Sequence, residues 1–196
     1  TIWILDGFEW KPAREIRKGD FLVVPIVKSE RRDYSEDELW LYGLYLAEGC
    51  TEWKPRKQYL TTLYFGKHEE ELVEKVVEKI REVFGYNPSV RYTRTAIAIT
   101  ISKKEIVQKF LRFGRKSTEK RIPMDVLLQS PELLRKLLEG YAEGDGCRKK
   151  YRLTLTTVSE QLVHDLRFLC FSRLGIPMGV YRRRGERYCI EGRAVS

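Results

Sequence analysis

Two nine-residue segments of the chain share a pattern that ends in an acid followed by glycine. Residues 41–49 read LYGLYLAEG and residues 138–146 read LEGYAEGDG, so the eighth position holds Glu48 in one and Asp145 in the other. Carboxylate oxygens are the ligands that Mg²⁺ prefers, and a cation held by two of them can promote hydrolysis of a phosphodiester. The paired acids therefore predict a metal-dependent hydrolytic site, provided that the fold brings the two segments together.

The elements that must bring them together are two helices with small residues on one face. Gly43 and Ala47 lie four positions apart in the first segment, as Gly140 and Gly144 do in the second. On a helix this spacing places both residues on the same face, where the missing side chains let two backbones approach closely. Glycine inside a helix costs about 0.5–1 kcal/mol relative to alanine, so its presence in both segments favours a packing role. We expect the two helices to pack directly against each other.

The last residues of both segments predict where the helices end. Gly49 and Gly146 are expected to form left-handed caps. Glu48 and Asp145 would then lie at the negative ends of two helix dipoles, where neighbouring acids repel each other unless a cation lies between them. The alternative is a pair of ordinary solvated acids at helix ends, but the matched copies favour the metal site.

A longer repeat surrounds the two segments. Residues 67–85 match residues 157–175 at an offset of 90, whereas Glu48 and Asp145 are 97 residues apart. The difference of seven residues predicts an insertion near residues 51–59. A repeat of this length indicates two related half-domains rather than a solenoid.

Each half predicts the same order of helices and strands, which indicates an α+β fold. Apolar periodicity and alternation place a motif helix first, then a strand, an amphipathic helix and two more strands. For the first half the expected ranges are 36–48, 59–66, 68–84, 88–94 and 96–102, followed by a helix at 103–113. For the second half they are 131–144, 151–157, 159–174, 178–184 and 187–191. Gly85 and Gly175 are expected to end the two amphipathic helices.

Both nine-residue segments resemble the LAGLIDADG motif, and residues 36–196 resemble a monomeric homing endonuclease that carries this motif twice. The resemblance implies two pseudo-symmetric αββαββα-type half-domains, at residues 36–122 and 123–196, whose antiparallel strands form a DNA-binding saddle. It also implies that the eighth-position acids, Glu48 and Asp145, bind the metal.

Two lysines are implied to assist these acids. Residues 120–123 (Lys-Arg-Ile-Pro) resemble the Lys-x-Ile-Pro stretch that precedes the second motif in related endonucleases. The resemblance makes Lys120 a catalytic candidate that polarises the attacking water or stabilises the developing charge. Lys67 ends the first strand, where the family often has Gln or Lys facing the metal. Its counterpart Thr157 is uncharged, so the two half-sites are expected to differ.

The resemblance implies a site-specific endonuclease that cuts both strands of a long, nearly palindromic DNA target. It implies Mg²⁺ as the cofactor, with Mn²⁺ as a substitute and Ca²⁺ supporting binding without cleavage, and a monomer acting on double-stranded DNA. The alternative is a DNA- or RNA-binding protein of the same fold that does not cut, such as a transcription regulator or an intron maturase. The sixth motif position, often acidic in the family, is Leu46 in the first copy and Glu143 in the second. Both eighth-position acids are present, which favours the cutting enzyme.

Basic residues are concentrated in the segments expected to be strands. The chain carries a net charge of +9, whereas residues 50–67, 85–104, 145–157 and 178–196 together carry +13. A surplus there suits DNA, because cations bind phosphates and arginine can also read guanine. It disfavours a uniformly charged, heat-tolerant surface as the explanation. The candidate DNA contacts are Lys54, Arg56, Lys57, Arg91, Arg94, Arg148, Lys149, Lys150, Arg152, Arg182, Arg183, Arg184 and Arg187.

Residues 1–35 precede the repeat and predict a small β-rich extension. Residues 3–10 are expected to form two short strands around an Asp-Gly turn, residues 21–25 another strand, and residues 30–37 a polar linker. Residues 10–20 resemble the W-x-x-A-x-x-I-x-x-G-D stretch of intein splicing domains. The chain lacks the terminal residues that splicing requires, so we do not expect it to splice. The extension is then a remnant of intein ancestry, an additional DNA-contacting arm, or a hairpin that packs on the core.

Composition bears on the remaining classes of protein. Hydrophobic residues make up 42% of the chain, which disfavours a disordered protein. No apolar run approaches the roughly 18 residues needed to cross a bilayer, so we expect an intracellular protein, of a prokaryote, with no membrane partner. The cysteines lack zinc-ligand spacing, and reduced thiols are expected, with a Cys50–Cys147 bridge left open.

Overall fold

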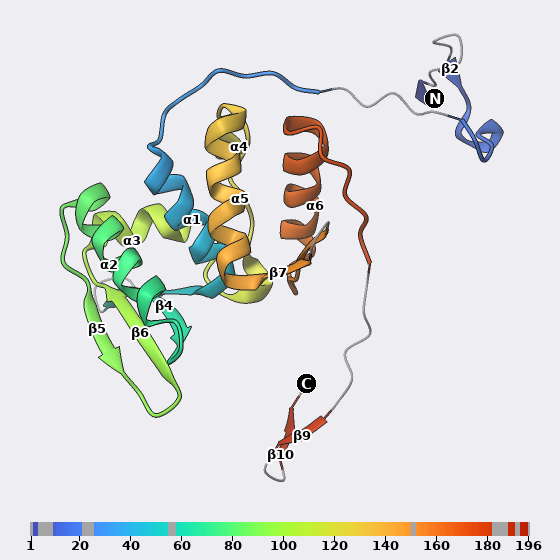
Figure 1. Ribbon diagram of the computed structural model, residues 1–196. Helices are drawn as coiled ribbons and strands as arrows, with labels where there is room; N and C mark the ends of the chain where they lie inside the picture. Colours follow the sequence, from blue (N-terminus) through green and yellow to red (C-terminus); the bar gives the residue numbers. More distant parts are fainter. Residues whose placement is uncertain are drawn as a thin grey trace.

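The computed structural model describes residues 2–3, 10–20, 26–54, 58–149, 152–181, 188–190 and 193–195. At its centre two helices lie side by side, α1 (Glu36–Glu48) and α5 (Pro131–Asp145), as Figure 1 shows. Their bounds confirm the predicted motif helices to within one residue. α1 is capped by Ser35, whose hydroxyl accepts a hydrogen bond from the Glu38 N–H, and α5 begins with Pro131, which suits a first helical turn.

The two helices pack through the glycines on their facing sides. A Cβ atom on Gly43 would overlap the carbonyl oxygen of Leu137, and one on Gly140 would overlap the carbonyl oxygen of Trp40. The backbone of the facing helix therefore occupies the space that a Cβ atom would need, so both positions require glycine. The prediction of direct helix packing is confirmed.

The prediction of left-handed caps at Gly49 and Gly146 is wrong. Gly49 has φ −98° and ψ 152°, and Gly146 has φ −94° and ψ 132°, so both are extended. Each motif helix runs straight into a strand, β3 (Gly49–Lys54) or β7 (Gly146–Lys149). Glycine is needed here for space, because a Cβ on Gly49 would overlap the ring of Tyr45.

The first half contains a four-stranded antiparallel sheet in the order β3-β4-β6-β5. The further strands are β4 (Gln58–Gly66), β5 (Ser89–Tyr92) and β6 (Ala96–Ile101). These three confirm the predicted strands, but β3 occupies part of the region expected to be an insertion. The seven additional residues instead lengthen the β3–β4 hairpin relative to its counterpart in the second half, formed by β7 and β8 (Arg152–Leu155).

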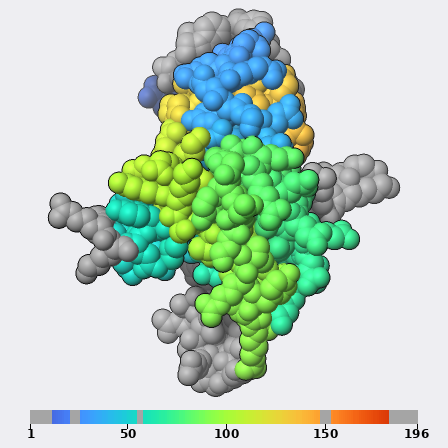
Figure 2. Space-filling model, turned by 90° about the vertical axis from the view of Figure 1, so that its left-hand side faces the viewer, coloured from blue at the N-terminus to red at the C-terminus, as the bar shows by residue number. Residues whose placement is uncertain are grey.

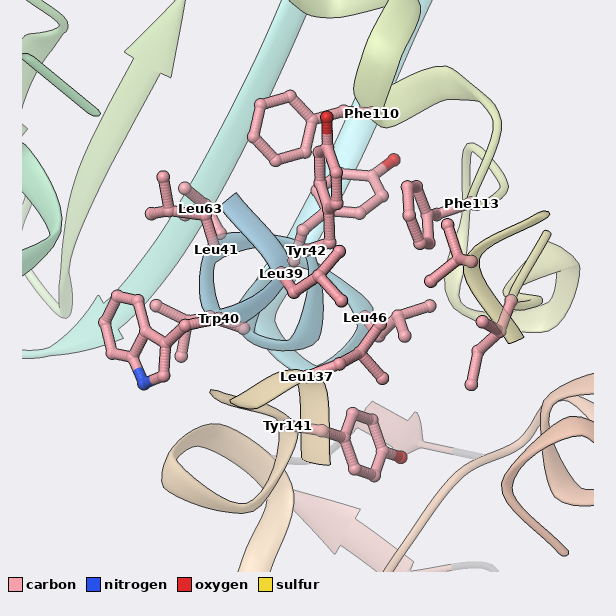
Figure 3. Close-up of a cluster of buried hydrophobic side chains, with 14 of the residues drawn as sticks. Leu39, Trp40, Leu41, Tyr42, Leu46, Leu63, Phe110, Phe113, Leu137 and Tyr141 are labelled. Carbon is pink, nitrogen blue, oxygen red and sulfur yellow. The ribbon is translucent and has the colours of Figure 1, made fainter. Parts of the chain in front are cut away.

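Helices α2 (Glu70–Phe84) and α3 (Lys104–Leu111) belong to the same half as this sheet. Figure 2 shows α2 beside the β5–β6 hairpin, which projects from the body. Gly85, with φ 57°, ends α2 in the left-handed conformation that the sequence predicted. The side chains between helices and sheet form the core, where Tyr42 of α1 meets Phe110 and Phe113 (Figure 3).

The second half repeats this plan with differences. It begins with the short α4 (Met124–Leu127), and α5 is followed by β7, β8 and α6 (Glu160–Phe168). The predicted single helix over 159–174 is divided, because α6 passes into a π-helical segment, η3 (Leu169–Arg173), before Gly175 at φ 66°.

The last predicted strands are borne out only in part. Residues 178–181 are not in a strand, and residues 182–187 lie outside the described residues. β9 (Tyr188–Ile190) falls within the predicted range 187–191, and it pairs with β10 (Arg193–Val195), which the sequence did not predict.

The front segment contains a short pair of strands, β1 (Ile2–Trp3) and β2 (Trp10–Lys11). The antiparallel pairing of Trp3 with Trp10 agrees with the expected hairpin, whereas residues 4–9 and the strand expected at 21–25 lie outside the described residues. The short helical turns η1 (Ala13–Glu15) and η2 (Ser117–Glu119) complete the elements. Across the described part of the chain, no helix is both long and apolar enough to cross a membrane.

Candidate active site

Glu48 and Asp145 are the last residues of α1 and α5, and both carboxylates are partly buried. The Glu48 Oε1 atom lies 3.1 Å from the position that a Cβ on Gly144 would take, so the carboxylate lies against the residue next to Asp145. Burial and then the charge of Asp145 raise the pKa of Glu48 to about 7. Burial also raises the pKa of Asp145. The fold thus brings the two predicted acids close enough to repel each other.

The donor atoms of this pair fit a hard divalent cation. Both groups offer only carboxylate oxygens, and their mutual repulsion is relieved when a cation binds between them. In the described ranges, no three His, Cys, Asp or Glu residues come close enough together to hold a metal. A cation at this place would therefore have most of its positions open to water and phosphate oxygens, which is typical of Mg²⁺.

The turn between β4 and α2 places another acid, Glu69, near enough to affect Glu48 electrostatically, and sequence reasoning missed it. Glu69 accepts a hydrogen bond from the Gly66 N–H at 2.5 Å, and its charge contributes to the raised pKa of Glu48. Lys67 lies in the same turn and is exposed to solvent. The repeat offset of 90 would have paired Glu69 with Ser159, an uncharged residue, so this acid is particular to the first half.

Lys120 lies beneath the last turn of α1. Only 2% of the residue is exposed, and its Nζ donates a hydrogen bond to the carbonyl oxygen of Tyr45 at 2.9 Å. Burial lowers the pKa of Lys120 to about 7, and the nearby Cys50 thiol opposes this shift. The Lys120 carbonyl accepts a hydrogen bond from Ser159 Oγ at 2.6 Å, which joins it to α6 of the second half. The sequence did not indicate that this lysine is buried.

The sixth motif positions do not join the carboxylate pair. Glu143 accepts a hydrogen bond from Trp40 Nε1 at 3.2 Å and pairs with Lys75 Nζ at 3.0 Å. Leu46 is 3% exposed and packs in the core. The acid at position six of the second motif thus holds α2 against the helix pair rather than a cation.

One face of the four-stranded sheet is turned away from the helices. The register places Leu63 and Ile99 on the helix side, so their neighbours along each strand project from the opposite face. This outer face carries Lys54, Gln58, Leu60, Thr62, Tyr64, Ser89, Arg91 and Thr100. The predicted DNA contacts Lys54 and Arg91 are among them, and Arg94 is exposed in the turn that joins β5 and β6. Gln58 and Tyr64 were not predicted.

The other basic candidates are not placed by the structure. Arg56, Lys57, Lys150, Arg182, Arg183, Arg184 and Arg187 lie outside the described residues. Arg148, Lys149 and Arg152 belong to β7 and β8, but their side chains are likewise not described. Their contacts with DNA stay predictions. Cys50 and Cys170 carry free thiols, as expected of reduced cysteines.

Fold and site together define an α+β protein in which two packed helices end in paired carboxylates beside an antiparallel sheet. The family model described as LAGLIDADG-like domain matches residues 35–120 and 132–193, well over half of the chain. The chain belongs to this family, as its two motifs indicated.

Curated relatives match most of this chain but only a small part of their own length. The replicative DNA helicase DnaB of Rhodothermus marinus is 29% identical over 186 residues, which cover 85% of this chain and 19% of the relative. DnaB of Synechocystis sp. is 29% identical over 195 residues, covering 88% and 21%. The replication factor C small subunit of Methanocaldococcus jannaschii is 25% identical over 164 residues, covering 81% and 8%. The chain thus spans about a fifth or less of these relatives.

Solved structures share the fold at low identity. The homing endonuclease I-DmoI in complex with DNA and Mn matches with a TM-score of 0.55 at 10% identity, covering 68% of this chain and 75% of that one. The homing endonuclease I-WcaI bound to its DNA recognition sequence matches with a TM-score of 0.52 at 14% identity, covering 84% and 76%. These matches confirm the predicted LAGLIDADG endonuclease fold.

Proposed function

We propose that the protein is a site-specific endonuclease that acts as a monomer on double-stranded DNA and requires Mg²⁺. The observation that carries this proposal is the convergence of Glu48 and Asp145 at the ends of two helices packed through glycine. Two repelling acids at one point are poorly explained by packing and well explained by a cation. The DNA complexes of I-DmoI and I-WcaI support the substrate class.

The roles of the chain's own groups follow from their positions. Glu48 and Asp145 would hold Mg²⁺, which supplies an activated nucleophile and stabilises charge on the scissile phosphate when bound. The exposed ammonium of Lys67, in the same turn as Glu69, can approach a phosphate oxygen. Lys120 is enclosed and acts through its field, which offsets negative charge at the end of α1. The two lysines thus assist in different ways.

The outer face of the first sheet is the proposed DNA-binding surface in that half. It carries basic groups near its margins, such as Arg91 and, in the adjoining turn, Arg94, together with neutral groups such as Gln58 and Tyr64. The acid on this face, Glu52, pairs with Lys54. Cations at the margins suit phosphates, whereas amide and hydroxyl groups can bond to base edges. Because the β3–β4 hairpin is longer than β7–β8, we expect the two halves of the target to be read unequally.

The relatives support the proposal that this endonuclease is carried as an insertion within other proteins. These relatives are different proteins, from a DNA helicase to a replication factor subunit and an A-type ATP synthase subunit of Pyrococcus abyssi, yet all match this chain. A shared segment within otherwise different proteins is expected of a mobile element. The intein-like residues 10–20 agree with a protein-level insertion.

The test begins with a pool of long random or genomic DNA, because the target is part of the question. DNA retained by the protein in Ca²⁺ is sequenced to find the site, and that DNA is then incubated with the protein in Mg²⁺. We expect binding alone in Ca²⁺ and double-strand cleavage in Mg²⁺. Specific DNA binding without cleavage in either metal would instead support the non-cutting regulator. Absence of DNA binding would contradict the endonuclease and the regulator and would leave the RNA-binding maturase.

A further inference from the structure

Residues 26–34, which we name the strap, precede α1 in the chain but pair with the second half. Arg31 forms a parallel bridge with Gln129, and its carbonyl oxygen accepts a hydrogen bond from the Ser130 N–H at 2.8 Å. Ser130 occupies the N-cap position of α5, although its hydroxyl makes no capping hydrogen bond. Val27 N–H donates to the carbonyl oxygen of Ser172 at 2.8 Å. Figure 1 shows the strap passing over the N-terminal ends of α1 and α5.

Gln129 is the buried centre of this contact. None of its surface is exposed, and its Oε1 accepts a hydrogen bond from the Asp33 N–H at 2.8 Å. Its Nε2 donates to Asp33 Oδ2 at 2.8 Å and to the carbonyl oxygen of Asp125 at 2.9 Å. The hydrogen bond from Gln129 lowers the pKa of Asp33. Both polar atoms of a buried amide are therefore used to hold the strap.

Two further contacts fix the same junction. Tyr34 donates a hydrogen bond to Asp125 Oδ2 at 2.6 Å and accepts one from Arg112 Nη1 at 3.1 Å, so it joins α4 to the end of α3. Arg173, which is 2% exposed, donates to the carbonyl oxygens of Leu127 and Gln129 at 2.8 and 2.6 Å. Elements of both halves thus meet where the motif helices begin.

The junction lies at the opposite end of the helix pair from the carboxylates. The two helix backbones approach most closely at Gly43 and Gly140, and the helices touch again where Gly144 lies against Ala47. Glu48 lies five residues beyond Gly43, or about 7.5 Å along the axis. A rotation of about 10° about the Gly43–Gly140 contact would displace the carboxylate by about 1.3 Å and disturb the contact at Gly144. An error of about 1 Å in a catalytic group can lower a rate by about a hundredfold.

We propose that Gln129, through the strap, is a positioning residue for the Glu48–Asp145 pair. By tying the beginnings of α1 and α5 to each other, it fixes the crossing of the helices and hence the separation of the acids at their ends. The family match begins at residue 35, so the strap lies just before the matched domain. The role in cleavage rests on the proposed endonuclease function, whereas the mechanical link does not.

The link is tested by Gln129→Met in the full chain, a change that keeps the length of the side chain and removes its polar atoms. Gln108→Met, at an exposed position on α3, is the matched control. Hydrogen exchange should become at least about tenfold faster in the first turns of α1 and α5 for Gln129→Met and stay unchanged for the control. Unchanged exchange at both helix ends in Gln129→Met would overturn the inference, whether or not the protein cuts DNA.

The role in catalysis is tested on DNA selected by the wild-type protein. We expect Gln129→Met to keep its affinity in Ca²⁺ within about threefold while its single-turnover cleavage in Mg²⁺ falls at least about tenfold. Equal losses of affinity and cleavage, or cleavage at the wild-type rate, would contradict a positioning role. A wild-type protein that does not cut would reject the proposed function and leave the exchange result to decide the link.

A milder pair of variants covers the case in which Gln129→Met fails to fold. Asp33 is exposed, and its carboxylate accepts the Gln129 Nε2 bond. Asp33→Asn keeps an acceptor for that bond, whereas Asp33→Ala removes it. We expect cleavage and exchange close to wild type for Asp33→Asn and the slower cleavage and faster exchange for Asp33→Ala. Indistinguishable behaviour of these two variants would also overturn the inference.

Discussion

The ammonium group of Lys120 lies 2.9 Å from the carbonyl oxygen of Tyr45 and 3.3 Å from the centre of the Tyr45 ring. The ammonium group of Lys120 therefore lies against the C-terminal turn of α1, where the helix dipole is negative. The carbonyl that it binds belongs to the turn that ends at Glu48. The positive charge of Lys120 and the position of the Glu48 carboxylate are thus linked through one turn of helix.

Lys120→Met should change how stability depends on pH. Burial lowers the pKa of Lys120 from 10.5 to about 7, so the unfolded chain binds this proton more tightly and stability rises with pH between these values. From pH 7 to pH 9 the wild type should gain about 2 kcal/mol that the variant does not gain. Urea unfolding at both pH values measures this, and parallel curves for the two proteins would show that Lys120 is not held in a buried place.

Glu48→Gln should have the opposite effect at lower pH in the absence of metal. The pKa of Glu48 is raised from 4.5 to about 7, so the folded protein binds this proton more tightly and loses stability as pH rises through that window. Because the carboxylate is half-exposed, we expect this loss of stability to be only about 1 kcal/mol, and Glu48→Gln should not show it. Thermal unfolding from pH 4.5 to 8 measures it, with Glu82→Gln on the exposed side of α2 as the control that should follow the wild type.

The helix crossing predicts a large difference between two glycine substitutions. Gly140→Ala should destabilise the protein by at least about 3 kcal/mol or prevent folding, because its Cβ would overlap the Trp40 carbonyl oxygen. Gly85→Ala meets open space and strains only a backbone at φ 57°, so about 1 kcal/mol is expected. Equal losses on urea unfolding would mean that the helices do not approach as closely as described.

The two faces of the first sheet make a matched prediction for DNA recognition. Tyr64 on the outer face is 47% exposed, whereas Tyr92 on the helix side is 63% exposed. Tyr64→Ala should relax the sequence preference among pool-selected DNA in Ca²⁺, and Tyr92→Ala should leave that preference unchanged despite its greater exposure. If only Tyr92→Ala loses the sequence preference, the helix side of the sheet reads the DNA, and the proposal for the outer face is wrong.

A basic residue at the margin of this face should behave differently. Arg94→Gln is expected to weaken binding to all sequences and to lower the slope of log affinity against log salt by about one, as for the loss of one phosphate contact. Its sequence preference should match that of the wild type. A changed preference with an unchanged salt slope would identify Arg94 as a base-reading residue.

Sequence reasoning predicted the packed helices and their terminal acids because these signals are local or repeated. Small residues four apart in each matched segment, Gly43 and Ala47 in one and Gly140 and Gly144 in the other, predicted two helices in contact with an acid at each end. The error at Gly49 has a physical cause, since glycine after a helix usually marks a left-handed cap but here gives way to the ring of Tyr45 as the chain enters β3.

What the sequence did not indicate depends on contacts between distant residues. Nothing local distinguishes Lys120, which is enclosed beneath α1, from a solvated lysine. Glu69 contributes to the raised pKa of Glu48 although the two acids are far apart in the sequence. Residues 30–37 were predicted to be a linker because charged residues usually mark one, whereas Asp33 is held by Gln129, a buried residue of the second half.

The most direct test of the shared carboxylate site is crystallographic. The protein is crystallised with its selected DNA and Mn²⁺, and anomalous scattering locates the ion. We expect an anomalous peak at about 2.1 Å from oxygens of both Glu48 and Asp145, the distance typical of Mg²⁺-like coordination. A fully occupied ion elsewhere on the DNA, with these two carboxylates uncoordinated, would contradict the account.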